Sequence, residues 1–193
     1  MPRRQKGLSF YRKKKRIDTN IVKEIFSWFF CIAASVFLAF VCVYVFGLKT
    51  SVIGSSMETS LYNGQEILVN RLVYQLSSPK RNDIVVFLPN NNHNTHFYVK
   101  RVVALPGETV QIRDGKVYVN GVAQEEIAYD KIADPGIAEN ELRLDSDEYF
   151  VLGDNRNDSY DARYWNNKII PEDRITGIAL VNYWPLSEIK LLR

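Results

Sequence analysis

The fold is decided by residues 97–120, FYVKRVVALPGETVQIRDGKVYVN. This stretch holds three runs rich in β-branched and aromatic residues, Phe97 to Leu105, Thr109 to Arg113 and Lys116 to Asn120. Such runs, separated by turn residues, are typical of β-strands. The pair Asp114-Gly115 supports the positive φ angles of a two-residue type I′ turn, so the last two runs are predicted to form an antiparallel hairpin.

Similar runs lie on both sides of this stretch, at Glu66 to Asn70, Asp83 to Leu88, Glu148 to Leu152 and Ile175 to Trp184. They predict a mostly β domain built on an antiparallel sheet. Two stretches lack the pattern, Asn90 to Thr95 and Glu125 to Asn140. Both are predicted to be loops.

Before the β-rich part lies an apolar run of 24 residues without a charged side chain, Ile25 to Leu48. As a helix it would span about 36 Å, enough for a hydrocarbon core of about 30 Å. A cleavable export signal is the closest alternative. Its apolar region would be only about 7–15 residues long and would end at a small-x-small site, which this run lacks. A single transmembrane helix at 25–48 is therefore predicted.

The residues before this run are basic. The first acidic residue, Asp18, follows eight lysines and arginines, and a tail of this kind can also bind nucleic acid. Beside a membrane span, however, it favours a cytoplasmic N-terminus by the positive-inside rule, and no nucleic-acid partner is expected. The predicted organisation is a cytoplasmic tail at 1–24, a transmembrane helix at 25–48 and an extracytoplasmic domain at 49–193.

Cysteine usage limits the chemistry of that domain, because Cys31 and Cys42 both fall within the apolar run. The external domain therefore has no cysteine, which excludes disulfides, thiolate-bound metals and a cysteine nucleophile. Serine is the alternative nucleophile, and Ser55 and Ser56 follow Gly54 shortly after the apolar run ends.

A serine nucleophile needs a neighbouring base. The two histidines, His93 and His96, lie in or beside the asparagine-rich loop, where a solvated role is the default. Lys100 lies within a predicted strand, and burial of its side chain would lower its pKa enough for it to accept a proton. The pattern alone favours the opposite arrangement, with Arg101 facing inward and Lys100 as a surface cation.

A dense polar segment, GDNRNDSYDAR at 153–163, directly follows an apolar strand. It predicts networks of paired charges. Asp154, Asp158 and Asp161 could also form a calcium loop, but their spacing misses the EF-hand pattern and two arginines would oppose a cation. No metal site is predicted.

Three segments, in this order behind one anchor, resemble the bacterial type I signal peptidase (leader peptidase) family, the peptidase S26-like Ser/Lys proteases. Ser56-Met57-Glu58-Thr59-Ser60-Leu61 is similar to a Ser-Met-x-Pro-Thr-Leu box. Lys100-Arg101-Val102 with Pro106-Gly107-Glu108 is similar to a Lys-Arg-Val box followed by Pro-Gly and an acid. The 153–163 segment matches the third box, and Gly64 to Asn70 looks like the strand that follows the first.

The resemblance implies a role for each matching residue. Ser56 would be the nucleophile and Lys100 its base, Ser159 would orient the Lys100 amine, and Asp161 and Arg163 would form a supporting ion pair. The oxyanion would be bound by backbone around Gly54 and Ser56. Thr59 and Ser60 depart from the family's Pro-Thr, so the turn after the nucleophile lacks the fixed φ of proline.

The implied activity is serine endopeptidase cleavage of signal peptides from exported preproteins after Ala-x-Ala-like sites, with no cofactor. The implied partners are signal-peptide-bearing preproteins, the lipid bilayer of the cell membrane and, nearby, the secretion translocon. The substrate would bind as an extended strand against an apolar wall. The candidate wall residues, which could equally be ordinary core, are Val52, Ile53, Met57, Tyr98 and Val99.

Two other classes of function stay open on the sequence. The first is a specialised or non-catalytic family member that acts in pilin or surface-protein assembly. The second is a membrane-tethered binding module without chemistry, which predicts that Lys100 is exposed to solvent.

Overall fold

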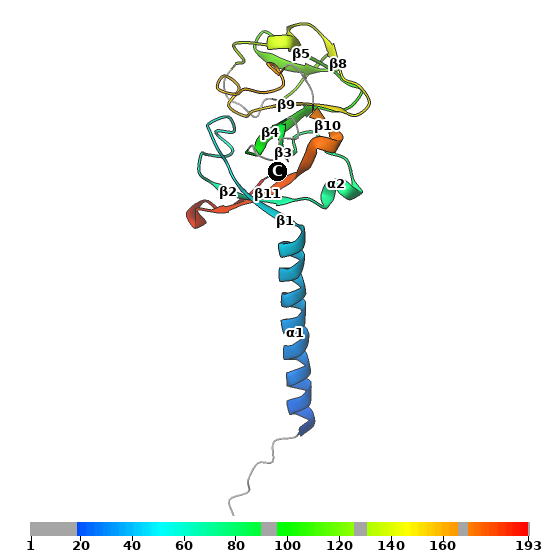
Figure 1. The fold of residues 1–193 in the computed structure, drawn as a ribbon, viewed down its shortest axis with the longest axis vertical. Helices are drawn as coiled ribbons and strands as arrows, with labels where there is room; N and C mark the ends of the chain where they lie inside the picture. The colour runs from blue at the N-terminus through cyan, green and yellow to red at the C-terminus, as the bar shows by residue number, and fades with distance from the viewer. Residues whose placement is uncertain (1–18, 90–95, 126–130, 166–169, 193) are drawn as a thin grey trace, which may run out of the picture. The chain divides into compact units, whose positions relative to one another are not determined.

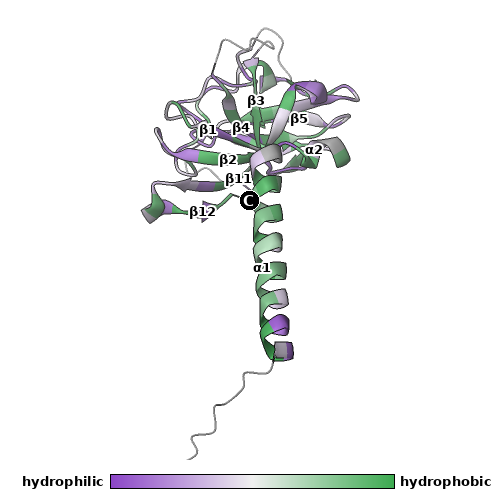
Figure 2. Ribbon diagram, turned by 60° about the horizontal axis from the view of Figure 1, so that its bottom comes forward, coloured by the Kyte–Doolittle hydropathy of each residue, from purple (hydrophilic) through white to green (hydrophobic). Residues whose placement is uncertain are grey.

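The computed structural model describes residues 19–89, 96–125, 131–165 and 170–192. The chain divides into two compact units after Val43. The first contains all but the last three residues of helix α1, Thr19–Phe46, which is apolar along most of its length (Figure 2). Within the described residues it is the one helix long and apolar enough to cross a membrane, over Thr19–Tyr44. The basic residues before it lie outside the described part.

The helix differs from the predicted span at both ends. It begins six residues before Ile25, and it ends at Phe46 because Gly47 and Leu48 belong to strand β1. An apolar pattern does not separate these two residues from the helix. Their pairing with β2 does, and that pairing is a tertiary contact.

An eight-stranded antiparallel sheet forms most of the second unit (Figure 1). Its order is β1-β2-β11-β3-β4-β9-β10, and β12 pairs with β11. Its strands are β1 Gly47–Ser51, β2 Glu66–Asn70, β3 Ile84–Phe87, β4 Tyr98–Ala104, β9 Glu148–Leu152, β10 Ile170–Pro171, β11 Ile175–Trp184 and β12 Lys190–Leu191. The short helix α2, Val73–Leu76, connects β2 to β3.

A smaller sheet, in the order β7-β6-β5-β8, lies at the end of the domain near β9 (Figure 1). Its strands are β5 Thr109–Arg113, β6 Lys116–Val119, β7 Val122–Ala123 and β8 Leu142–Arg143. The predicted hairpin is confirmed: β5 pairs with β6, and Asp114 and Gly115 have φ angles of 54° and 78°.

The mostly β prediction is confirmed, and each of the seven predicted runs contains a strand that begins and ends within one residue of the expected bounds. The two-residue strands and the four-residue helix α2 were missed, because two to four residues carry no periodic pattern. The five-residue strand β1 was missed as well, since its first two residues continue the apolar run. Glu125 to Asn140 is largely irregular in its described part but contains the 3₁₀ turn Gly136–Glu139. The predicted loop Asn90 to Thr95 lies outside the described residues.

Strand β4 separates two hydrophobic cores. Val102 packs with Phe150 and Leu152 in one core, and Val99 packs with Ile67 in the other. Because both faces of β4 are covered, Lys100 and Arg101 are only 4% and 3% exposed. The alternative in which Lys100 is a surface cation is therefore wrong.

Candidate active site

Lys100 and Ser56 meet at the surface of the large sheet. Lys100 Nζ donates a 2.6 Å hydrogen bond to Ser56 Oγ. β4 supplies the lysine, and the loop after β1 supplies the serine. That loop is held by two backbone hydrogen bonds, from Val52 N to Gln65 O at 2.8 Å and from Gly64 N to Val52 O at 2.9 Å.

Burial lowers the pKa of Lys100 from 10.5 to about 8. Desolvation of the ammonium is the main cause. The carboxylates of Asp161 and Asp154 oppose it by stabilising the charged form, and Arg163 adds a smaller lowering effect. With this pKa about a tenth of the lysine is neutral at pH 7. A neutral lysine hydrogen-bonded to a serine hydroxyl is the arrangement that a Ser/Lys general-base pair requires.

The turn after Ser56 closes without the family's proline. Met57 O accepts hydrogen bonds from the N–H groups of Ser60 and Leu61, both at 2.8 Å. Met57 and Leu61 are fully buried, so their side chains anchor the turn in the core. Backbone hydrogen bonds and burial therefore stabilise the turn where Thr59 and Ser60 replace Pro-Thr.

The polar segment after β9 supplies two buried ion pairs. Arg101 binds Asp154 through two hydrogen bonds of 2.7 Å, and Arg163 binds Asp161 through hydrogen bonds of 2.9 and 3.0 Å. Asp161 Oδ2 also accepts a hydrogen bond from the Gly153 N–H at 3.2 Å. The Arg101–Asp154 pair connects the segment to β4, and the Arg163–Asp161 pair joins two residues within the segment.

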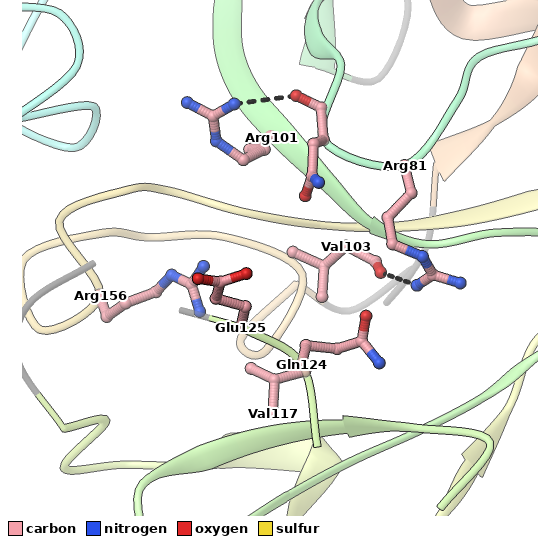
Figure 3. Close-up of a pocket in the computed structure, with 8 residues that line it drawn as sticks. Arg81, Arg101, Val103, Val117, Gln124, Glu125 and Arg156 are labelled. Atoms are coloured by element: carbon pink, nitrogen blue, oxygen red, sulfur yellow. Dashed lines mark hydrogen bonds between the residues drawn. The ribbon is translucent and has the colours of Figure 1, made fainter. Parts of the chain in front are cut away.

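A polar cavity separate from Ser56 and Lys100 is lined by three arginines, Arg81, Arg101 and Arg156 (Figure 3). Arg101 points toward Asn82 and binds its carbonyl oxygen at 2.8 Å, while Arg81 binds the carbonyl of Val103. Arg81 also pairs with Glu108. This cavity therefore belongs to the charge network that supports β4 and lies apart from the Ser56 hydroxyl.

Ser159 differs from the expectation. It is 9% exposed, and its hydroxyl has no hydrogen-bond partner within the described residues. The expected hydrogen bond to Lys100 is thus not formed in this structure, in which Lys100 Nζ donates to Ser56 Oγ. Ser159 is still close to the site: a Cβ built on Gly153 would lie 2.2 Å from Ser159 Oγ and 2.4 Å from Ser56 O.

A cleft runs along the serine and lysine. All five residues predicted as its apolar wall line it, and Val52, Met57 and Val99 also belong to a buried core. The complete lining is Val52, Ile53, Gly54, Ser55, Ser56, Met57, His96, Phe97, Tyr98, Val99, Lys100, Asp158 and Tyr160. The wall residues are therefore both core and cleft surface.

His96 lines the cleft, and His93 lies outside the described residues. In the part of the chain that is described, Ser56 Oγ is bonded to Lys100 and to no histidine. This geometry favours lysine over histidine as the base.

The two expected oxyanion positions, Gly54 and Ser56, differ in their contacts. The Gly54 N–H donates a 3.0 Å hydrogen bond to Asn63 Oδ1. The Ser56 N–H has no partner among the described residues. Sequence reasoning missed Asn63, since nothing in the turn Tyr62-Asn63-Gly64 marks the asparagine as a partner for a loop nine positions earlier.

Two further polar residues at the site were also missed, and both come from the segment after β9. Asn155 binds the carbonyl oxygens of Ser55 and Ser56, and Asp158 accepts a hydrogen bond from the Ser55 hydroxyl. Their positions in the 153–163 segment were the available signal, but their partners lie about a hundred positions away.

Known proteins match this chain over most of its length. The family model for signal peptidase, peptidase S26, matches residues 23–184. A probable signal peptidase I-2 of Synechocystis is 38% identical over 72% of this chain and 63% of its own length. The chain thus spans slightly less than two thirds of that relative.

Two other matches cover nearly all of the protein compared. Signal peptidase I T of Bacillus subtilis is 31% identical over 92% of both chains. A crystal structure of a signal peptidase I from Enterococcus faecalis aligns with a TM-score of 0.44 and 30% identity, covering 53% of this chain and 97% of that one.

Proposed function

The chain belongs to the signal peptidase, peptidase S26, family, and on this premise we propose that it is a membrane-anchored signal peptidase I that removes signal peptides from exported preproteins. The observation that carries the proposal is the 2.6 Å hydrogen bond between Lys100 Nζ and Ser56 Oγ, made by a lysine that is 4% exposed. This pair gives the family's activity a nucleophile and a base.

The mechanism follows from that contact. Neutral Lys100 takes the proton from Ser56 Oγ as the oxygen attacks the scissile carbonyl carbon, and a tetrahedral oxyanion forms. The carbon–nitrogen bond then breaks, and the lysine ammonium gives its proton to the leaving amine. Water next loses a proton to Lys100 as its oxygen attacks the ester carbonyl carbon. The bond from that carbon to Ser56 Oγ then breaks, Lys100 returns the proton to Ser56 Oγ, and the signal peptide leaves with its new terminal carboxyl group.

Backbone geometry supports binding of an extended substrate on one side of the cleft. The N–H and C=O of Val52 are hydrogen-bonded to Gln65 and Gly64, and the Gly54 N–H is hydrogen-bonded to Asn63. In an extended segment, the N–H and C=O of successive residues point to opposite sides. The N–H and C=O of Ile53 therefore point away from residues 63–65.

The other side of the cleft offers a similar edge. β9 pairs with β4 only from Arg101 onward, so the same edge of β4 carries no described strand at Val99 and Lys100. A substrate strand can hydrogen-bond to such edges.

The cleft wall supports a preference for small side chains before the cut. Val52, Met57 and Val99 are buried at 2%, 1% and 6% exposure and pack into the core behind the cleft. Close-packed core side chains cannot move aside to make space for a bulky substrate side chain without strain. We therefore propose cleavage after small-x-small sequences such as Ala-x-Ala.

The helix α1 fits the proposed location. It would anchor the protein in the cell membrane as a single span, with the basic tail in the cytoplasm and residues 49–193 outside. There the protein would meet preproteins in the bilayer near the secretion translocon.

The test is cleavage of a preprotein with an Ala-x-Ala site by the full chain in detergent or liposomes, with the product N-terminus sequenced. We expect cleavage by the wild type only, and none by Ser56→Ala or Lys100→Met. Failure of the folded wild type on several preproteins would refute a general signal peptidase. Cleavage of only a narrow subset would instead indicate a specialised enzyme.

A further inference from the structure

Asn155 donates hydrogen bonds to two consecutive backbone carbonyl groups, those of Ser55 and Ser56. Its side-chain Nδ2 donates a 3.2 Å hydrogen bond to Ser55 O, and its backbone N–H donates a 3.1 Å hydrogen bond to Ser56 O. Asn155 follows β9 in the segment that carries the buried ion pairs, directly after Asp154, which pairs with Arg101.

The hydrogen bond from Asn155 to Ser55 O determines the direction of the Ser56 N–H. Ser55 C=O and Ser56 N–H belong to one planar trans peptide group, in which the oxygen and the hydrogen point in opposite directions. Asn155 holds the oxygen on its own side. The N–H is therefore directed away from Asn155, and Asn155 is not among the described residues that line the cleft, whereas Ser55 and Ser56 are.

The Ser56 N–H is also available to donate a hydrogen bond to an oxyanion. No partner within the described residues uses the Ser56 N–H, while the neighbouring Gly54 N–H is bonded to Asn63. The segment after β9 lies directly behind the serine, because a Cβ on Gly153 would come within 2.4 Å of Ser56 O. The Ser56 carbonyl, which follows the Ser56 N–H in the chain, therefore has little space in which to move.

Building on the signal peptidase function proposed above, we propose that Asn155 is a positioning residue that aims the Ser56 N–H at the oxyanion through the Ser55 carbonyl. It does not contact the reacting atoms. A well-aimed donor to an oxyanion contributes about 100- to 1,000-fold to kcat. Loss of its aim, with the donor still present, is expected to lower kcat by about 10- to 100-fold.

The experiment compares Asn155→Ala with Asn157→Ala in the full chain in detergent, with an Ala-x-Ala preprotein as substrate. Asn157 is the matched control, because it lies two positions further in the same segment and its side chain hydrogen-bonds to backbone as well, to Lys131 O and from Ala133 N. We expect Asn155→Ala to lose kcat as stated, with KM changed less than about threefold, because an oxyanion donor acts in the transition state. Asn157→Ala should keep wild-type kcat.

Two readouts separate positioning from a general structural role. The midpoint of the pH–rate profile should not move in Asn155→Ala, because Lys100 and Ser56 keep their contact. Asn155→Asp keeps the size of the side chain but replaces the donor with an acceptor that repels Ser55 O. It should therefore lose at least as much kcat as Asn155→Ala while its thermal unfolding stays close to that of Asn157→Ala.

Equal kcat for the Asn155 and Asn157 variants would overturn the inference, as would a shifted pH midpoint or a loss confined to KM. A wild type that cleaves no preprotein would instead refute the proposed function, and that result is visible before any variant is compared.

Discussion

Lys100 Nζ lies 2.6 Å from Ser56 Oγ, although the two residues are 44 positions apart in the sequence. The lysine is almost fully buried, and that burial lowers its pKa to about 8. The contact and the lowered pKa together make both the activity and the stability of the protein depend on the protonation state of Lys100.

The activity should depend on pH through Lys100. Only the neutral amine can accept the Ser56 proton, so kcat/KM should rise about tenfold per pH unit below about 8 and level off above it. Initial rates of preprotein cleavage from pH 6 to 10, in buffers of equal ionic strength, measure this. A profile that is flat between pH 6 and 9 would rule out Lys100 as the titrating base.

Lys100→Met should abolish cleavage yet stabilise the fold at pH 7. The unfolded lysine has a pKa of 10.5 and the folded one about 8, so the unfolded state binds more protons between those values and wild-type stability rises with pH across that window. Each pKa unit corresponds to about 1.4 kcal/mol, so the cost below pH 8 is up to about 3 kcal/mol. Methionine removes this cost.

The measurement is thermal unfolding of wild type and Lys100→Met in the same detergent at pH 7 and pH 10.5. The variant's advantage should be present at pH 7 and vanish near pH 10.5. An advantage of the same size at both pH values would show that packing, and not the lysine charge, is responsible.

Ser159→Ala should lower activity without lowering stability. The buried Ser159 hydroxyl has no partner among the described residues, so its removal relieves a desolvation cost of about 1–3 kcal/mol. If the hydroxyl steadies the Lys100 ammonium once Ser56 has given up its proton, kcat should fall by about 10- to 100-fold. Wild-type kcat in a variant of equal or greater stability would remove Ser159 from the mechanism.

Asp161→Asn should destabilise the domain by about 3–5 kcal/mol. Asp161 and Arg163 are 0% and 1% exposed at their side chains, and the substitution leaves a buried guanidinium without its counter-charge. Glu108→Gln is the control, because the Arg81–Glu108 pair is 27% and 19% exposed and should cost about 1 kcal/mol or less. Chemical denaturation of both variants in one detergent measures the difference, and equal losses would contradict the argument from burial.

Gly153→Ala should inactivate the enzyme by about 100-fold or more. The added Cβ would lie 2.4 Å from Ser56 O and 2.2 Å from Ser159 Oγ, so the serine must shift. The double variant Gly153→Ala/Ser159→Ala separates the two clashes. It should stay inactive, because the contact with Ser56 O persists, and recovery of activity would place the effect at Ser159 instead.

The strands with long periodic patterns could be predicted from the sequence because their signals are local. Alternating apolar residues and the Asp114-Gly115 turn mark β5 and β6 without reference to the rest of the chain. The apolar helix is equally local, since an uncharged run of membrane-spanning length carries its own signal. Gly47 and Leu48 were assigned to it wrongly because only their partner β2 identifies them as a strand.

The candidate site divides in the same way. Residue type and order pointed to Ser56, Lys100 and the 153–163 segment, because the chemistry needs a nucleophile and a base and the resemblance supplied their positions. The sequence left open whether Lys100 or Arg101 faced inward. The tertiary structure buried both, since cores cover both faces of β4.

The remaining features depend on atoms brought together from distant parts of the chain. Asn63 occupies the Gly54 amide, Asn155 holds the Ser55 and Ser56 carbonyls, and the Ser159 hydroxyl is buried without a partner. The sequence by itself determined the membrane-type helix, the main strands and the reactive residue types, because those are properties of short segments. Only the tertiary structure decided which amide is free and which way the lysine points, because hydrogen bonds and desolvation depend on neighbours that folding supplies.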